Sequence, residues 1–142
     1  MRQEFFTAVD GIHHGWRAPQ GDAPTVVFAN SLGTDLRVWD RVVALLPESW
    51  GLLRQDKRGH GLSVARPVLT IETMADDTET LLDHHGIRRF AGVGLSVGGL
   101  IMQRLAVRRP EGMSHLVLSD TAAKIGSPDI WNPRIEAIRA NG

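Results

Sequence analysis

The fold is predicted most directly from a five-residue stretch, Gly94-Leu95-Ser96-Val97-Gly98. This stretch follows an apolar run at 90–95 that predicts a strand, and it leads into a helix predicted over 97–109, just before Pro110. Small residues two positions before and after a serine let neighbouring backbone pass close to a tight strand-to-helix turn. A serine at such a turn holds a strained backbone conformation and projects its hydroxyl. We therefore predict that Ser96 is a nucleophile.

These glycines have two alternative interpretations. Residues 92–97 place Val97 where a dinucleotide-binding pattern needs its third glycine, and no GxxxxGK[ST] segment occurs, so nucleotide binding is disfavoured. The structural alternative is a glycine-rich turn that only packs a helix on a sheet. The strand–turn–helix context favours the nucleophile.

Predicted strands and helices alternate along the sequence on both sides of this stretch. A hairpin turn is predicted at Asp10-Gly11, and the apolar run Thr25–Ala29 is typical of a strand buried on both faces. Strands are predicted at 4–9, 13–17, 25–29, 51–56, 90–95 and 115–120, and helical spacing is found at 38–46, 71–85 and 97–109. Short connections between alternating elements predict an α/β protein, a mostly parallel doubly wound sheet with an N-terminal β-hairpin. The loops after the parallel strands then share one edge, where sites in such folds lie.

Composition narrows the class of protein. The 142 residues carry 16 Lys+Arg and 16 Asp+Glu, so the formal net charge is zero, which argues against nucleic-acid partners and against a polybasic membrane surface. The absence of cysteine excludes disulfides, thiol nucleophiles and cysteine metal sites. No apolar run approaches the ~18–20 residues of a membrane span, and the N-terminus lacks a signal-peptide pattern, so a cytoplasmic location is expected.

A nucleophilic serine needs donors for the oxyanion that forms during attack. One donor is the backbone N–H of the residue after the nucleophile, here Val97, at a helix start where the dipole favours negative charge. The second is expected near Leu32, in the loop after the strand at 25–29. Because both donors are backbone groups, this assignment rests on position alone.

Three motifs together resemble the α/β-hydrolase family. They are Asn30-Ser31-Leu32-Gly33-Thr34-Asp35-Leu36 with Trp39, then Asp56-Lys57-Arg58-Gly59-His60-Gly61, then Gly94-Leu95-Ser96-Val97-Gly98-Gly99. The resemblance covers nearly the whole chain and implies an α/β-hydrolase fold. More narrowly, Leu118-Ser119-Asp120-Thr121-Ala122-Ala123-Lys124-Ile125-Gly126, with Trp131-Asn132 and Arg134-Ile135, is similar to 3-oxoadipate enol-lactonases of the β-ketoadipate pathway. The departures from that pattern are Val97 for Met, Lys57 in the glycine-rich loop and Asp120 for Asn.

The resemblance also implies structure beyond Gly142. In the family a helical cap follows the sixth strand, the catalytic acid usually follows the seventh strand and the histidine follows the eighth. We therefore expect a fold truncated after the sixth strand, with residues 1–126 as the N-terminal part of the core and residues 127–142 as the start of the cap. The missing triad members are expected outside this chain. A complementing C-terminal polypeptide or a homo-oligomer would then cover the exposed sheet edge.

The chain itself contains residues that could in principle replace the missing triad members. His60 follows a strand at the active edge, but the resemblance makes its loop a brace of the pocket rather than the source of a base. Asp120 is an alternative acid, against the simpler interpretation that it is a turn residue accepting local N–H bonds. Asp56 and Arg58 are expected to form an internal ion pair or a loop brace. Surface or packing roles are expected for the remaining histidines, which are His13, His14, His84, His85 and His115.

The enol-lactone resemblance implies a substrate with a free carboxylate. Arg134 is a candidate clamp because a guanidinium binds a carboxylate bidentately, and Trp131, three residues earlier, would wall the same pocket if this segment is helical. The alternative is a cap helix with a buried stripe of Ile130, Ile135 and Ile138. The expected function is a serine hydrolase that opens 3-oxoadipate enol-lactone to 3-oxoadipate in aromatic catabolism, without metal or organic cofactor.

Two further classes of function remain open. The first keeps the fold and changes the substrate: a carboxylesterase, a C–C bond hydrolase or a cofactor-free haloperoxidase-like enzyme. The second is a non-catalytic binding module that has kept half of the fold. The intact Gly-Leu-Ser-Val-Gly-Gly at 94–99 argues against the second class.

Overall fold

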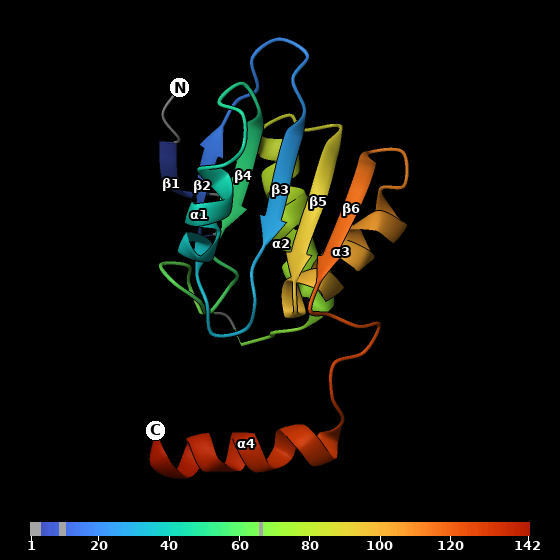
Figure 1. Ribbon diagram of the computed structural model, residues 1–142. Helices are drawn as coiled ribbons and strands as arrows, with labels where there is room; N and C mark the ends of the chain where they lie inside the picture. Colours follow the sequence, from blue (N-terminus) through green and yellow to red (C-terminus); the bar gives the residue numbers. More distant parts are fainter. Residues whose placement is uncertain (1–3, 9–10, 66) are drawn as a thin grey trace.

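The computed structural model describes residues 4–8, 11–65 and 67–142, and six strands form one sheet in the order β1-β2-β4-β3-β5-β6 (Figure 1). The strands are β1 Glu4–Ala8, β2 Ile12–Arg17, β3 Thr25–Ala29, β4 Gly51–Gln55, β5 Phe90–Leu95 and β6 Met113–Ser119. β1 and β2 form an antiparallel hairpin, and β2 also pairs antiparallel with β4. From β4 to β6 every pairing is parallel. The predicted mostly parallel sheet with an N-terminal hairpin is confirmed.

The predicted turn between β1 and β2 is described only in part. Ala8 pairs with Ile12 at the end of the hairpin, and Gly11 has a φ of +76°, a conformation that glycine adopts without a steric penalty. Val9 and Asp10, which were expected in the strand and the turn, lie outside the described residues.

Helices cover the two faces of the sheet unequally. The helical elements are η1 Leu36–Trp39, α1 Asp40–Val43, α2 Ile71–His84, α3 Val97–Arg108 and α4 Pro128–Asn141. α2 and α3 pack side by side behind the sheet, whereas α1 lies in front of it (Figure 1). Successive residues of β3 point to opposite faces of the sheet. Val27 and Ala29 belong to the core under α2 and α3, and Val26 and Phe28 belong to a smaller cluster with Trp39. β3 is thus buried on both faces, as its continuous apolar run predicts.

The helix predicted from the spacing of residues 38–46 is much shorter in the structure. One 3₁₀ turn and a single α-helical turn replace it, and i→i−3 bonds then close the turns at Leu45 and Leu46. Leu36 and Trp39 are the buried residues, because residues three apart lie on the same side of a 3₁₀ helix. Leu45 is 87% exposed, whereas Val43 and Leu46 are partly buried against the cluster that contains Trp39, so only part of the predicted apolar spacing marks a packed face.

The other two predicted helices closely match the structure. Thr70 caps α2 through a reciprocal capping box with Thr73, and Gly86 follows the helix at a φ of +65°. α3 ends one residue earlier than predicted, at Arg108. These agreements reflect local signals, since the capping residues and the proline act within one turn of the helix they bound.

The carboxyl-terminal part of the chain is open to solvent. β6 is one of the two edge strands, and nearly all of its residues are exposed, including Leu116, Val117 and Leu118. A loop then leads to α4, which lies apart from the sheet below the carboxyl ends of the strands (Figure 1). Within the described residues, no helix combines the length and the apolar character needed to cross a bilayer.

Candidate active site around Ser96

Ser96 occupies a strained turn between β5 and α3. Its φ of 52° and ψ of −117° place a non-glycine residue in a region that L-amino acids rarely adopt. The surrounding glycines are required by close backbone approach: a Cβ on Gly94 would lie 2.5 Å from the carbonyl oxygen of Gly98, and one on Gly98 would overlap the carbonyl oxygen of Ala29. The strained turn expected for the G-x-S-x-G pattern is therefore present.

Backbone and side-chain hydrogen bonds hold this turn in place. The Ser96 N–H donates to the carbonyl oxygen of Ser119 at 2.9 Å, which ties the turn to the end of β6. The Ser96 carbonyl oxygen accepts from the Gly99 N–H at 2.8 Å and from the Thr121 hydroxyl at 2.7 Å. Among the described residues, no group hydrogen-bonds to the Ser96 hydroxyl, and the residue is half-buried. The hydroxyl is therefore available to a base and a substrate.

The two predicted oxyanion donors lie on segments that touch. Val97 is the first residue of α3, where the backbone N–H groups have no partner within the helix. The loop after β3 packs against this helix start, because a Cβ on Gly98 would also lie 2.9 Å from the carbonyl oxygen of Asn30. Leu32 follows two residues later in that loop, with its side chain half exposed. The backbone thus brings residues 30–34 and residue 97 to the same edge of the sheet.

Side-chain hydrogen bonds organise the loop after β3. Asn30 is fully buried and its amide donates to the carbonyl oxygen of Thr34. The Ser31 carbonyl oxygen accepts from the Thr34 hydroxyl at 2.9 Å and from the Lys57 ammonium at 2.7 Å. Sequence reasoning noted Lys57 only as a departure from a family pattern. Its burial against a backbone carbonyl depends on the pairing of β3 with β4, which no local signal predicts.

The glycine-rich loop after β4 is a brace, as expected, but through partners that were not foreseen. Asp56 is buried and accepts the backbone N–H of Leu36 at 2.8 Å and of Leu62 at 2.9 Å, so it ties the loops after β3 and β4 together. Arg58 forms a bidentate pair with Asp77 on α2, with one contact at 2.6 Å. Arg58 therefore pairs with a helix, whereas the predicted pair was with Asp56 inside the loop.

His60 stays within the same loop. Its Nδ1 lies 3.2 Å from the carbonyl oxygen of Arg58, and burial is the main cause that lowers the pKa of the imidazole. This hydrogen bond agrees with a bracing role for His60.

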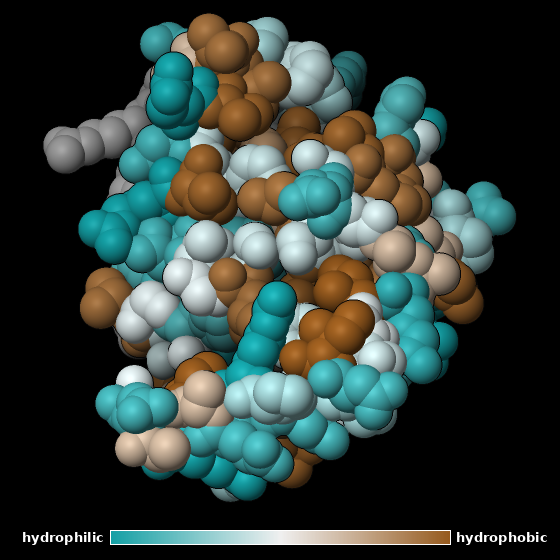
Figure 2. Space-filling model, turned by 60° about the horizontal axis from the view of Figure 1, so that its bottom comes forward, coloured by the Kyte–Doolittle hydropathy of each residue, from teal (hydrophilic) through white to brown (hydrophobic). Residues whose placement is uncertain are grey.

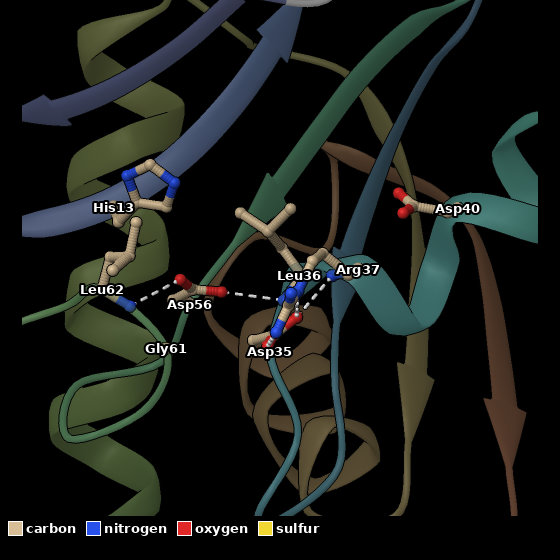
Figure 3. A pocket seen from close by; sticks show the side chains of 8 residues that line it. All are labelled: His13, Asp35, Leu36, Arg37, Asp40, Asp56, Gly61 and Leu62. Atoms are coloured by element: carbon tan, nitrogen blue, oxygen red, sulfur yellow. Dashed lines mark hydrogen bonds and ion pairs between the residues drawn. The ribbon is translucent and has the colours of Figure 1, made fainter.

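A cavity of about 510 Å³ lies between the loops after β3 and β4 (Figure 3). Its lining residues are His13, Asp35, Leu36, Arg37, Asp40, Asp56, Gly61 and Leu62. Asp35 is paired with Arg37, whose guanidinium lowers the pKa of that carboxyl to about 2. Ser96 does not line this cavity. The face that carries the carboxyl ends of the strands is shown in Figure 2, where apolar side chains gather in patches among polar ones.

Of the remaining histidines, His13 lines this cavity, and the others serve packing or lie at the surface. His14 is buried on β2, its Nε2 lies 2.9 Å from the Nε2 of His85, and the His85 ring stacks on Trp16 with centroids 4.8 Å apart. In the order of the sheet, β4 and β3 separate this cluster from β5. His115 is exposed on β6. Among the described residues, no group of three or more potential ligands is arranged to hold a metal ion.

The candidate residues after β6 lie in the open part of the chain. Asp120 is exposed at a φ of +45°, and no described group hydrogen-bonds to its carboxylate, so the local N–H bonds expected for a turn residue are not formed. In α4, the Trp131 indole N–H donates to the carbonyl oxygen of Ile125 at 2.9 Å. The Arg134 guanidinium lies 5.3 Å from the centre of the Trp131 ring. The two residues share one side of a helix, as their spacing predicts.

The isoleucines of α4 were the alternative interpretation of this segment. Ile130, Ile135 and Ile138 are all exposed, so the expected apolar stripe is not buried by the described residues. Thr121 is a further positioning candidate that sequence reasoning missed, because its hydrogen bond to Ser96 follows from the pairing of β5 with β6.

Comparison with known proteins agrees with this geometry. The family described as "alpha/beta hydrolase fold" matches residues 24–141. Two 3-oxoadipate enol-lactonases of Acinetobacter baylyi are 38% and 36% identical to this chain over 125 and 121 residues, which is 87% and 85% of this chain and 46% of each relative. The crystal structure of the enol-lactonase from Burkholderia xenovorans is 40% identical with a TM-score of 0.85, over 98% of this chain and 55% of that one.

The three matched proteins are all longer than this chain. The chain spans about half the length of the curated relatives and of the solved structure that it matches. Across that half, the sheet and the strained serine turn described above coincide with a family match that covers most of the chain. The chain therefore belongs to the α/β hydrolase family.

Proposed function

We propose that this chain is the nucleophile-bearing part of a serine hydrolase that opens 3-oxoadipate enol-lactone to 3-oxoadipate in aromatic catabolism. The assignment as a serine hydrolase rests on Ser96. This non-glycine residue has a φ of 52°, and no described group hydrogen-bonds to its hydroxyl. The enol-lactone substrate is supported by the similarity to proteins named enol-lactonases at 36–40% identity.

The chemistry follows from the placement of backbone donors. The Ser96 hydroxyl attacks the lactone carbonyl carbon, and a base takes its proton as the new bond forms. The N–H groups of Leu32 and Val97 stabilise the resulting oxyanion. Collapse of this intermediate breaks the ring C–O bond, the base returns its proton to the released oxygen, and the resulting enol stays attached to the acyl group. Water then hydrolyses the acyl-enzyme, and the enol tautomerises to the ketone of 3-oxoadipate.

The base and its acid partner are proposed to lie outside residues 1–142. Among the described residues no histidine hydrogen-bonds to Ser96, and this chain covers only 46% of each of the two enol-lactonase relatives. The exposed apolar residues of β6 and α4 provide a surface for that second part, supplied by the same polypeptide, by a complementing one or by another copy. In this proposal residues 127–142 begin the helical cap over the site.

The first test uses the natural polypeptide that carries residues 1–142 and follows enol-lactone opening by absorbance. We expect turnover in the wild-type protein and a loss of at least about a thousandfold in kcat for Ser96→Ala, because the nucleophile is removed. Thr80→Ala, which removes a half-buried hydroxyl that donates to the Asp76 carbonyl oxygen on α2, is a matched control. Unchanged turnover in Ser96→Ala contradicts the proposal, as does full activity of residues 1–142 alone.

The substrate is tested separately from the reaction class. Arg134 is proposed to bind the substrate carboxylate, so Arg134→Ala is expected to lower kcat/KM for the enol-lactone by about tenfold to a hundredfold, as expected for a lost charged hydrogen bond. It should leave a neutral aryl ester unaffected. Arg139→Ala removes an exposed charge from the same helix as a control. Faster turnover of simple esters than of the lactone would favour a carboxylesterase. If a fluorophosphonate failed to label Ser96 in the active assembly, a binding module would be favoured.

A further inference from the structure

Lys57 is a buried cation whose ammonium group has one described hydrogen-bond partner. The residue is 2% exposed, and its ammonium donates to the Ser31 carbonyl oxygen at 2.7 Å. The two acidic groups whose charges act on Lys57 are engaged elsewhere, since Asp56 accepts two backbone N–H groups and Asp35 pairs with Arg37. Burial of an ammonium without an ion pair is costly, whereas an apolar side chain of similar length would fill the same space. The lysine at this position therefore calls for a role beyond packing.

The carbonyl oxygen that Lys57 binds belongs to the peptide group that carries one of the two proposed oxyanion donors. The Ser31 carbonyl and the Leu32 N–H belong to the same planar peptide unit, so a group that holds the oxygen also fixes the direction of the N–H. A cation on the carbonyl oxygen draws electron density from the amide and strengthens its N–H as a donor. The hydroxyl of Thr34 reaches the same oxygen at 2.9 Å but carries no charge.

We propose that Lys57 is a positioning residue for the oxyanion donor: through the Ser31 carbonyl it orients and polarises the Ser31–Leu32 peptide, so that the Leu32 N–H faces the oxyanion formed at Ser96. This inference rests on the proposed function, because it assigns a task to the same site. It accounts for the buried charge, for its hydrogen bond to a backbone oxygen, and for the contact between the 30–34 loop and the start of α3.

The proposal has a consequence for pH. Burial lowers the pKa of the Lys57 ammonium to about 8, while the charges of Asp56 and Asp35 act in the opposite direction. His60 is the other titratable group whose charge couples to Lys57. Above pH 8 the neutral amine can still donate a hydrogen bond but no longer polarises the peptide. Activity is therefore expected to fall as the pH rises through about 8.

The kinetic test compares Lys57→Met with the wild type in the natural polypeptide. We expect kcat to fall about tenfold with little change in KM, which is less than the hundredfold or more reported for loss of a whole oxyanion donor. The decline of kcat above pH 8 should disappear in this variant. Arg89→Met, which removes an exposed cation at the opposite edge of the sheet, is the matched control. A Lys57→Met enzyme with the kinetics and the pH profile of Arg89→Met would overturn the proposal.

A second readout does not depend on activity. In protein labelled with ¹⁵N-leucine, the amide resonance of Leu32 is expected to move in Lys57→Met and to stay in place in Arg89→Met. In the wild type the same resonance should titrate with a midpoint near pH 8, which serves as the test if Lys57→Met does not fold. A Leu32 resonance that ignores both the substitution and the titration would overturn the inference. A wild-type protein that lacks hydrolase activity but shows the expected titration would refute the proposed function alone.

Discussion

The strands on either side of β5 differ in how completely they are covered. β3 and β4 are buried on both faces, between α2 and α3 on one side and η1 and α1 on the other. β6 pairs with β5 along one edge only, and its apolar residues face solvent together with those of α4. Ser96 lies at the boundary between the two regions. The nucleophile turn is therefore supported from the β3 side, whereas the support on its other side depends on what covers β6 and α4.

The largest expected difference between the regions is the effect of deleting a leucine side chain. Leu53 on β4 is buried and Leu118 on β6 is 43% exposed. In residues 1–142, Leu53→Ala should reduce the free energy of unfolding by about 2–5 kcal/mol, because it removes buried contacts and leaves a cavity. Leu118→Ala should reduce it by less than about 1 kcal/mol. Urea denaturation followed by circular dichroism measures both.

The same pair also tests what covers β6. If a longer polypeptide or a partner packs on this strand, the cost of Leu118→Ala should rise in that assembly toward the cost of Leu53→Ala. Equal costs in residues 1–142 alone would contradict the division of the sheet into a covered and an open region.

Backbone strain offers a second comparison. Ser96 and Asp120 are the two non-glycine residues with positive φ in the described chain, one at the end of β5 and one at the end of β6. Ser96 combines its φ with a ψ of −117°, far from the left-handed helical region that Asp tolerates. Ser96→Gly should therefore raise the free energy of unfolding by about 1–3 kcal/mol while abolishing hydrolysis, and Asp120→Gly should raise it by less than about 1 kcal/mol. Thermal denaturation of both variants decides the order, and a destabilised Ser96→Gly protein would contradict the strain.

Local sequence signals predicted the elements that local interactions define. The glycines around Ser96, the cap at Thr70 and the apolar run of β3 each act within a few residues, and each appears in the structure as predicted. The helix predicted from the spacing after Val38 is shorter in the structure, where Val38, Val42 and Leu45 are exposed and only part of the apolar set packs on the sheet. The roles of Lys57 and Thr121 depend on which strands pair, so residues distant in sequence supply their partners.

The smallest expected effect concerns acid. His14 and His85 share a hydrogen bond between β2 and the end of α2, and burial, with the neighbouring His14 and His84, lowers the pKa of His85 to about 4. The unfolded chain then binds more protons than the folded chain between the ordinary histidine pKa near 6.5 and about 4, so stability should fall as the pH drops through this window. Because His85 is partly exposed, we expect a loss of about 1 kcal/mol or less at pH 5.5.

Two histidine variants test whether this pH dependence of stability comes from the covered region of the sheet. His85→Gln should reduce the difference between urea midpoints at pH 7.5 and pH 5.5, whereas His115→Gln, on the exposed strand β6, should leave that difference unchanged. His60, whose pKa is also lowered, contributes to the remaining slope in both variants. An equal slope in wild type and His85→Gln would show that the histidine pair does not link the hairpin to α2 in a pH-dependent way. The acid sensitivity of this fold would then come from its carboxylates, which titrate at lower pH.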